Sequence, residues 1–539
     1  MGGDSPDTRL RTLLVGLDGA CWPVVEGVPD GDLPHLRGLV DRGAAGPLAA
    51  QLPPWTASAW PSIYTGVNPG RHGVFDFLTF DGYDWDVVNR SSVREHAIWE
   101  LADRHGLTSV VVNVPVTGPP RPFDGALVPG YVSPDPPTCH PPDLLEWLQD
   151  RVGPYRVYPD ADDDRESRIE EYRELVRQRG EAFRALAGRF EPEFGFLQFQ
   201  STDTVFHELP ADDAAVHAVY RAVDEQLGEV LAACQPETVV VVSDHGIGPY
   251  DGYGFRINEF LREHGYLEAT RGGEGMPSWS SIAQGRLLAD AERTRTERAL
   301  SGATALVASA GLTSQRIERL LEPLGLAEFV AERVPTEAIR AGTEQVDFPA
   351  SRAYVRSRLE LGVRLNLAGR EPDGKVPADE YERVRSELRE LLSGVETPDG
   401  EPVFDAVLPR EAVFDGPHAD RGPDLVTVPA GYDHLPTAAL LGERFGPPPE
   451  PYEHKPDGVV VAAGKAINCD DPIEGAQALD VAPTVLSTLG VPASERMEGT
   501  ALRVVEPAAR ERYPPFEAEE QTGRDRAVEQ HLAEMGYLE

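Results

Sequence analysis

The sequence has very little lysine. Only Lys375, Lys455 and Lys465 occur among its 539 residues. Aspartate and glutamate total 90, against 50 lysine and arginine, so the formal net charge is −40. Such an acidic surface repels nucleic-acid phosphates and anionic membranes, and no basic stripe is present, so we expect no nucleic-acid binding. The composition is typical of adaptation to high salt, where screening weakens self-repulsion, and an ordinary acidic enzyme from a GC-rich genome is the alternative.

Cysteine is scarce too, and long apolar runs are missing. The four cysteines form no CxxC pair: Cys21, Cys139, Cys234 and Cys469. This spacing argues against a zinc ribbon or a disulfide framework and fits a reducing cytoplasm. The N-terminus has no basic segment followed by a long apolar one, so we expect no signal peptide. No run reaches the roughly 18 apolar residues of a membrane-spanning helix, and we expect a cytoplasmic protein of undetermined oligomeric state.

Short apolar runs alternate with longer helical patterns in the first half of the chain. The runs predicted as buried strands are Thr12–Leu17, Thr108–Val112, Phe194–Gln200 and Thr238–Val242. The patterns predicted as helices are Leu33–Arg42, Arg165–Ala187 and Ala211–Cys234. This alternation predicts an α/β fold with a mainly parallel central sheet and helices on both faces. In such sheets, functional groups gather at the carboxyl ends of the strands.

The pattern changes after about residue 267, which predicts an inserted cap subdomain. We expect a first core part (1–267), the cap (268–414), a second core part (415–505) and an acidic tail (506–539). Within the cap, Arg352–Leu367 alternates like strands. The expected helices of the cap and the tail are Arg286–Leu300, Thr313–Arg333, Ala378–Leu392 and Arg526–Met535. The expected elements of the second core part are the strands Asp424–Val428 and Gly458–Ala462 and the helix Ala478–Leu489.

Acidic and histidine side chains follow two of the predicted strands. Asp18 comes directly after the first strand, where an aspartate is either a metal ligand or a simple turn cap. Asp244 and His245 follow Thr238–Val242. An oxygen and a nitrogen ligand side by side at the end of a buried strand are hard to explain by packing. We therefore expect Asp244 and His245 to bind a metal ion.

A hydroxyl opens a predicted helix at Thr56, within the segment Pro53–Ser62. Free backbone N–H groups and the helix dipole at this position would stabilise both an ionised hydroxyl and an arriving phosphate. The alternative is that Thr56 only caps the helix.

Two further positions supply histidine. Asp203 and His207 are four residues apart, so on a helical turn both face one side and can reach the same divalent ion. The alternative is a surface polar pair. His454 is flanked by turn residues, as a ligand delivered from a loop would be, although a lone histidine is more often structural.

Together these positions supply three aspartates, three histidines and one hydroxyl. This mixture of nitrogen and oxygen ligands suits Zn²⁺, and Mn²⁺ is possible. The number of ligands fits two ions, which would clamp the attacking and leaving oxygens of an in-line displacement. One ion would also activate the threonine hydroxyl as a nucleophile.

These residues resemble the alkaline phosphatase superfamily, most closely its branch of type I phosphodiesterases/nucleotide pyrophosphatases and predicted phosphohydrolases or phosphomutases. The matching motifs occur in the family's order: Leu17–Gly19, Pro54–Thr56 with Thr65–Gly66, Asp203 with His207, Ser243–Gly246, and His454 with Gly458. The resemblance implies one metal on Asp18, Thr56, Asp244 and His245, and another on Asp203, His207 and His454. It also implies attack by Thr56 on phosphorus and a phosphothreonine intermediate that water hydrolyses.

One position departs from the resemblance. Nucleotide pyrophosphatases of this branch carry a phosphate-binding asparagine where this sequence has Phe77, and Arg71, Asn68 or Asn113 is a candidate substitute. With Trp60, the residues Arg71, Phe77 and Asn113 are our candidates for substrate binding. We expect a phosphodiesterase acting on a small-molecule phosphate ester. A phosphomonoesterase or phosphomutase with a closing cap is the alternative, and a non-catalytic binding protein or a sulfatase is disfavoured.

Overall fold

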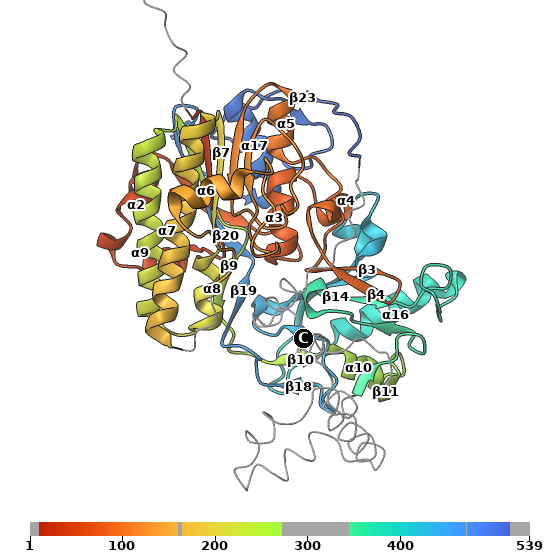
Figure 1. The fold of residues 1–539 in the computed structure, drawn as a ribbon. Coiled ribbons are helices and arrows are strands. Elements are labelled where there is room, and N and C mark those ends of the chain that lie inside the picture. Colours follow the sequence, from red (N-terminus) through yellow and green to blue (C-terminus); the bar gives the residue numbers. More distant parts are fainter. Residues whose placement is uncertain (1–9, 160–163, 272–343, 470–471, 518–539) are drawn as a thin grey trace, which may run out of the picture.

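The computed structural model describes residues 10–159, 164–271, 344–469 and 472–517. Within these residues the largest element is an eight-stranded sheet (Figure 1). Its strands, in order across the sheet, are β21 (Ala476–Gln477), β2 (Ala44–Ala49), β20 (Asp457–Gly464), β8 (Thr238–Val242), β1 (Thr12–Leu17), β7 (Phe194–Phe199), β5 (Ser109–Val112) and β6 (Gly125–Val128). Only β20 runs antiparallel to its neighbours, β2 and β8. The prediction of a mainly parallel sheet is confirmed.

Helices cover both faces of this sheet. In β1, Leu13 and Val15 join the apolar cluster on one face and Leu14 joins the cluster on the other, so the strand is buried on both sides. One face packs against α2 (Pro34–Arg42), α7 (Arg165–Phe190) and α9 (Asp213–Cys234). The other packs against α3 (Thr56–Thr65), α5 (Ile98–Arg104) and α17 (Val481–Leu489) (Figure 1). This arrangement confirms the predicted covering of both faces.

A second body, which we call the cap, comprises the described residues between 254 and 446. Its antiparallel sheet has the order β13 (Ala353–Tyr354), β14 (Gly362–Leu365), β16 (Leu425–Pro429) and β15 (Phe404–Pro409). The helices α16 (Tyr381–Ser393) and α10 (Ile257–Glu263) share the apolar cluster of this sheet. The cap lies beside the core hairpin formed by β3 (Leu78–Asp81) and β4 (Asp84–Val87) (Figure 1).

The other α-helices and strands of the described residues are short, and most of these strands pair in small sheets of two or three strands. They are α1 (Trp22–Gly27), α4 (Pro69–His72), α6 (Leu144–Val152), α8 (Ser201–Glu208), β3 (Leu78–Asp81), β4 (Asp84–Val87), β9 (Gly246–Pro249), β10 (Gly254–Arg256), β11 (Ala269–Arg271), β12 (Glu344–Val346), β17 (Pro436–Thr437), β18 (Phe445–Gly446), β19 (Tyr452–Lys455), β22 (Ala493–Ser494) and β23 (Arg510–Glu511). No helix among the described residues is long and apolar enough to cross a membrane.

One predicted strand lies in a different sheet from the one we expected. We expected Asp424–Val428 to rejoin the core, but β16 pairs with β14 and β15 of the cap, so that expectation is wrong. A short apolar run indicates a strand without indicating its partner, which explains the error. The other predicted strand, Gly458–Ala462, does lie in the central sheet as part of β20.

The buried residues of the cap's apolar cluster run from Phe255 to Leu440, and Phe445 packs against them. We therefore propose domain boundaries near residues 254 and 446 in place of 268 and 414. The predicted strands at Arg352–Leu367 correspond to β13 and β14, and the predicted helix at Ala378–Leu392 corresponds to α16. The other predicted helices of the cap and the tail lie outside the described residues: Arg286–Leu300, Thr313–Arg333 and Arg526–Met535.

The three central parallel strands end at one level. Leu17 of β1 pairs with Phe199 of β7, and Gly16 pairs with Val242 of β8. The residues after β1, β7 and β8 therefore meet at the carboxyl edge of the sheet. Asp18 follows β1, α8 follows β7, and the segment from Asp244 follows β8.

Candidate metal centre and active site

Asp18, Asp244 and His245 meet at this edge, and we call them the strand-end group. His245 Nε2 lies 3.5 Å from Asp18 Oδ1 and 3.3 Å from Asp244 Oδ2. All three side chains are buried, with exposed fractions of at most 1%. Three potential ligands at this spacing can share one divalent ion.

Thr56 is the first residue of α3 and lies against the strand-end group. Its hydroxyl donates to Asp18 Oδ1 at 3.2 Å and is 3.4 Å from His245 Nε2. The residue at the cap position is Trp55, and no side chain caps the helix there. Thr56 is therefore not a helix cap, and its hydroxyl is directed at two candidate metal ligands.

Asp203, His207 and His454 form a second cluster, which we call the α8–β19 group after the elements that carry it. Asp203 and His207 lie one turn apart on α8, as predicted, with Asp203 Oδ1 3.4 Å from His207 Nε2. His454 Nε2 is 3.6 Å from the same carboxylate oxygen and 3.3 Å from His207 Nε2. Three ligand atoms thus face a common point.

His454 joins the two groups. It lies in β19, which pairs with β9 so that His454 is opposite Ile247. Its ring stacks on that of His245 with centroids 3.6 Å apart. We expected His454 to come from a loop, but the structure places it in a two-stranded ladder. The structure gathers the six candidate ligands and Thr56 at one place, in the same division that the resemblance implies.

The imidazoles are oriented by their other ring nitrogens. His454 Nδ1 donates to the carbonyl of Pro54 at 3.0 Å, and His245 Nδ1 donates to the carbonyl of Gly246 at 3.0 Å. His207 Nδ1 donates to Glu450 Oε2 at 2.8 Å. Since Nδ1 carries the proton in each neutral ring, Nε2 keeps its lone pair for a metal ion.

Asp18 is oriented in a similar way. Its Oδ2 accepts hydrogen bonds from Trp60 Nε1 at 2.7 Å and from Gln198 Nε2 at 2.8 Å. Gln198 in turn accepts from Asn113 Nδ2 at 2.7 Å. These bonds leave Oδ1 directed toward Thr56 and His245.

Gly19, next to Asp18, has a backbone conformation and surroundings that only glycine tolerates. Its φ is +65°, and a Cβ at this position would lie 2.8 Å from Asp203 Oδ1. Its amide donates to Asp244 Oδ1 at 3.3 Å. The glycine therefore allows the two ligand groups to approach each other.

The electrostatics of the buried carboxylates fit divalent cations. Burial raises the pKa of Asp18 and, more strongly, that of Asp244, and the neighbouring carboxylates raise both further. Burial also opposes ionisation of Asp203, but His207 together with His454 and His245 outweighs it and lowers the Asp203 pKa. Asp244 Oδ2 is buried and accepts no hydrogen bond from the described residues. Bound cations would compensate these charges, so the residues present fit a metal centre.

The four candidate substrate-binding residues are engaged within the protein. Trp60, Phe77 and Asn113 are at most 1% exposed. Trp60 and Asn113 support Asp18 directly or through Gln198, and the Phe77 ring packs edge-on against Tyr131. These contacts give Trp60 and Asn113 a supporting role, and substrate contact by the three residues stays a prediction. Arg71 forms ion pairs with Asp415 and Glu498, and its role in substrate binding stays a prediction.

Three supporting residues were not predicted. Gln198 lies inside the apolar strand β7 and is buried. A glutamine within an apolar run is the one feature of the sequence that could have indicated its supporting role. Glu450 holds His207, and Arg358 of the cap pairs with Glu450 and Glu453. No sequence pattern marks these two, because their contacts depend on how the cap meets the core.

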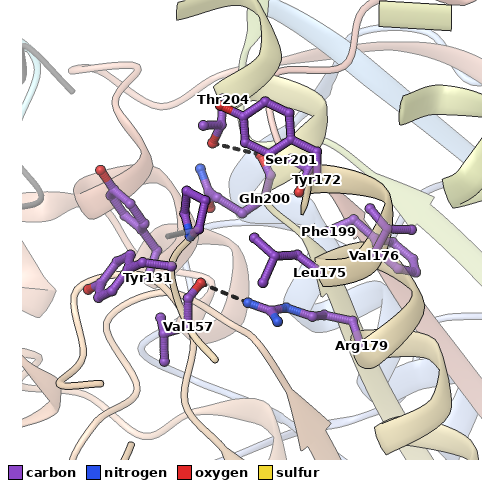
Figure 2. Close-up of a pocket in the computed structure, with 12 residues that line it drawn as sticks. Tyr131, Val157, Tyr172, Leu175, Val176, Arg179, Phe199, Gln200, Ser201 and Thr204 are labelled. Carbon is purple, nitrogen blue, oxygen red and sulfur yellow. Dashed lines mark hydrogen bonds between the residues drawn. The ribbon is translucent and has the colours of Figure 1, made fainter. Parts of the chain in front are cut away.

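A cavity lies beside α8 (Figure 2). Gln200, Ser201 and Thr204 line one side of it, and α7 contributes Leu175 and Arg179. The helix α8 thus directs Asp203 and His207 toward the candidate metal centre, and Ser201 and Thr204 toward the cavity.

Comparison with known proteins gives one family and one fold. The model of the family described as type I phosphodiesterase / nucleotide pyrophosphatase matches residues 12–432. Phosphonoacetate hydrolase from Sinorhizobium meliloti 1021, in complex with phosphonoacetate, is 16% identical with a TM-score of 0.51, over 88% of this chain and 94% of that chain. Murine ectonucleotide pyrophosphatase / phosphodiesterase 5 is 13% identical with a TM-score of 0.48, over 90% and 96%. No curated protein matches the chain. The hydrolase structure confirms the alkaline-phosphatase-like fold.

Proposed function

The chain belongs to the type I phosphodiesterase/nucleotide pyrophosphatase family of phosphoric ester hydrolases, and we propose that it cleaves a small-molecule phosphodiester with Thr56 as nucleophile. The observation that carries this proposal is the position of the Thr56 hydroxyl. It lies 3.2 Å from Asp18 and 3.4 Å from His245, at the start of a helix. A threonine placed only for packing would not need two buried ionisable partners.

Two divalent ions would be held by the two groups of ligands. Asp18, Asp244, His245 and Thr56 would hold one, and Asp203, His207 and His454 the other. Their nitrogen and oxygen donors favour Zn²⁺, with Mn²⁺ as the alternative. Bound ions would supply Lewis-acid chemistry that lowers the pKa of the Thr56 hydroxyl and offsets charge on the phosphoryl group.

The residues of the chain perform the rest of the reaction. The Thr56 hydroxyl gives up its proton as Oγ1 attacks phosphorus, the P–O bond to the leaving group breaks in line, and the departing alkoxide takes up a proton. The amides of Ser58 and Ala59 already donate to the carbonyl of Trp55, and we expect the amides at the very start of α3 to be the ones that bind the phosphoryl oxygens. Water then attacks the phosphothreonine, and Thr56 regains its proton as the phosphate monoester leaves.

The type of ester is the least constrained part of the proposal. Phe77 stands where the resemblance implies a phosphate-binding asparagine, which disfavours nucleotide pyrophosphatase activity. A phosphomonoesterase or phosphomutase with the same metal centre is the alternative. A non-catalytic binding protein would have no reason to keep all six ligands and Thr56 together. High-salt adaptation and a cytoplasmic location stay predictions from composition.

Kinetics of Thr56 variants test the proposal. We expect Thr56→Ala to lower kcat on bis-p-nitrophenyl phosphate by about 10⁴-fold or more, since nucleophile removal costs that order of rate. Thr56→Ser keeps a hydroxyl and should retain measurable turnover. Both variants should bind metal and be assayed at high salt with Zn²⁺ or Mn²⁺ added. Equal activity of metal-replete Thr56→Ala and wild type would refute the nucleophile, and hydrolysis of monoesters alone would refute the diesterase.

A further inference from the structure

A chain of charged groups connects the cap to one half of the candidate metal centre. Arg358 begins η4 (Arg358–Glu360), which leads into β14 of the cap sheet. Its Nη2 lies 3.3 Å from Glu450 Oε1, and the other oxygen of Glu450 accepts from His207 Nδ1 at 2.8 Å. We infer that Arg358 and Glu450 are positioning residues through which the cap sets the geometry of the α8–β19 group. This inference rests on the proposed function.

Arg358 supports a second ligand by another route. Its Nη1 donates to Glu453 Oε2 at 3.0 Å, and Glu453 Oε1 accepts from the backbone amide of His454 at 3.0 Å. One guanidinium therefore holds the two carboxylates that contact His207 and His454. The planar fork of arginine suits this bridging, and lysine would hold only one carboxylate well.

Burial makes these interactions stronger than ordinary surface ion pairs. Arg358 is 6% exposed, Glu453 is 1% exposed, and the Glu450 side chain is 21% exposed. Removal of Arg358 would leave two carboxylates facing each other in a poorly solvated place. The Glu450 carboxylate would then no longer be held against His207.

The neighbours of Arg358 hold it at the junction of the two bodies. Leu359 and Leu361 are at most 1% exposed and belong to the apolar cluster of the core, together with residues of α3 and α17. The next residues, Gly362–Leu365, form β14 of the cap. The residues next to Arg358 thus pack in the core on one side and pair in the cap sheet on the other. The position of Arg358 therefore depends on how the cap packs against the core.

The strand-end group offers a contrast within the same centre. Its supports are Trp60 of α3 and Gln198 of β7, both in the core. The inference therefore makes a selective prediction: loss of Arg358 or Glu450 should weaken one of two metal equivalents and leave the other unchanged.

Titration of the full-length chain with Co²⁺, followed by its visible absorption, tests this selectivity. We expect two equivalents in the wild type. In Arg358→Met and Glu450→Ala, one equivalent should bind about 10- to 100-fold more weakly with an altered spectrum, as for other outer partners of metal ligands. Arg358→Lys should recover part of the affinity. The control is Arg385→Met in α16, whose partners Glu382 and Glu411 contact no candidate ligand.

The outcomes separate this inference from the proposed function. Two equivalents with unchanged affinity and spectrum in Arg358→Met would overturn the inference and leave the metal centre standing. Equal weakening of both equivalents, or the same loss in Arg385→Met, would show a general structural effect and also overturn it. A wild-type chain that binds no Co²⁺ would overturn the metal centre and the inference together.

Discussion

The two halves of the candidate metal centre are built differently. The strand-end group follows directly from parallel strands whose ends lie level in the sheet. The α8–β19 group combines a helix with a short ladder that enters after the cap. The supports of the first group come from the core, and those of the second include Arg358 of the cap.

This difference means that different parts of the protein determine the geometry of the two ligand groups. The geometry of the strand-end group is determined by sheet register, which changes only if the core unfolds. The geometry of the α8–β19 group depends on the junction between two bodies. We therefore expect substitutions in the core to alter the strand-end group. Substitutions at the junction of the core and the cap should alter the α8–β19 group.

Among the changes that separate the two halves, the largest expected effect follows from Asp244→Asn, which removes a charged candidate ligand of the strand-end group. Loss of an outer partner of a metal ligand lowers activity by up to about 100-fold. Loss of a direct ligand should lower it by more than that. Burial and Asp18 raise the Asp244 pKa, so this carboxyl costs the metal-free fold stability as the pH rises above the ordinary range of aspartate. The metal-free variant should therefore melt at a higher temperature than the metal-free wild type.

Thermal scans in the presence of a chelator, beside kcat/KM with metal added, measure both effects of Asp244→Asn. Thr56→Ser serves as control, because it leaves the buried carboxylates in place. A variant that is less stable without metal and still active would contradict the account of the strand-end group.

An intermediate effect is expected from Gln198→Leu. This change removes the hydrogen bond that orients Asp18 Oδ2 while keeping the volume of the side chain. Activity should fall by about 10- to 100-fold, and only the strand-end equivalent of Co²⁺ should bind more weakly.

The matched control for Gln198→Leu is Gln178→Leu, which changes another buried glutamine in α7 that donates to Glu174. If Gln198→Leu instead weakened the α8–β19 equivalent, the division between the two halves would not hold.

The smallest expected effect concerns Asp76, a buried core residue that interacts with Ser357 and Glu360 of the cap. Burial and Glu360 raise the pKa of Asp76 to about 7, above its ordinary value. A raised pKa means that the stability contribution is present at low pH and is lost as pH rises toward 7. Asp76→Asn should therefore gain in melting temperature relative to wild type between about pH 4 and pH 7.

Melting curves at several pH values measure this difference, and Asp84→Asn, an exposed change on the β3–β4 hairpin, should show no such trend. Parallel curves for Asp76→Asn and wild type would argue against a buried, protonated Asp76 at the junction.

The sequence predicts much of the core and of the ligand set. Strands such as Thr12–Leu17 are apolar on both faces. Polar residues directly after them indicate the edge of the sheet where the candidate metal centre lies. Asp18, Asp244 and His245 could be chosen for this reason, and Asp203 with His207 because helical spacing is regular. The order of these motifs along the chain also matches that of the alkaline phosphatase superfamily.

What depends on contacts between distant segments could not be predicted. The apolar run at Asp424–Val428 correctly indicates a strand but not its sheet, because an apolar run does not specify the strand with which it pairs. Glu450 and Arg358 are ordinary charged residues in the sequence, and only the docking of the cap gives them their place. Gln198 was visible as a polar residue in an apolar strand.

The most direct test of the central claim is to trap the covalent intermediate. The metal-replete enzyme would be mixed with a phosphodiester, quenched with acid within the first turnover and analysed by mass spectrometry of its peptides. The account predicts a phosphoryl group, still carrying one ester substituent, on the peptide that contains Thr56, and none in Thr56→Ala. A first-turnover burst with the adduct on another residue, or turnover of Thr56→Ala at the wild-type rate, would contradict it.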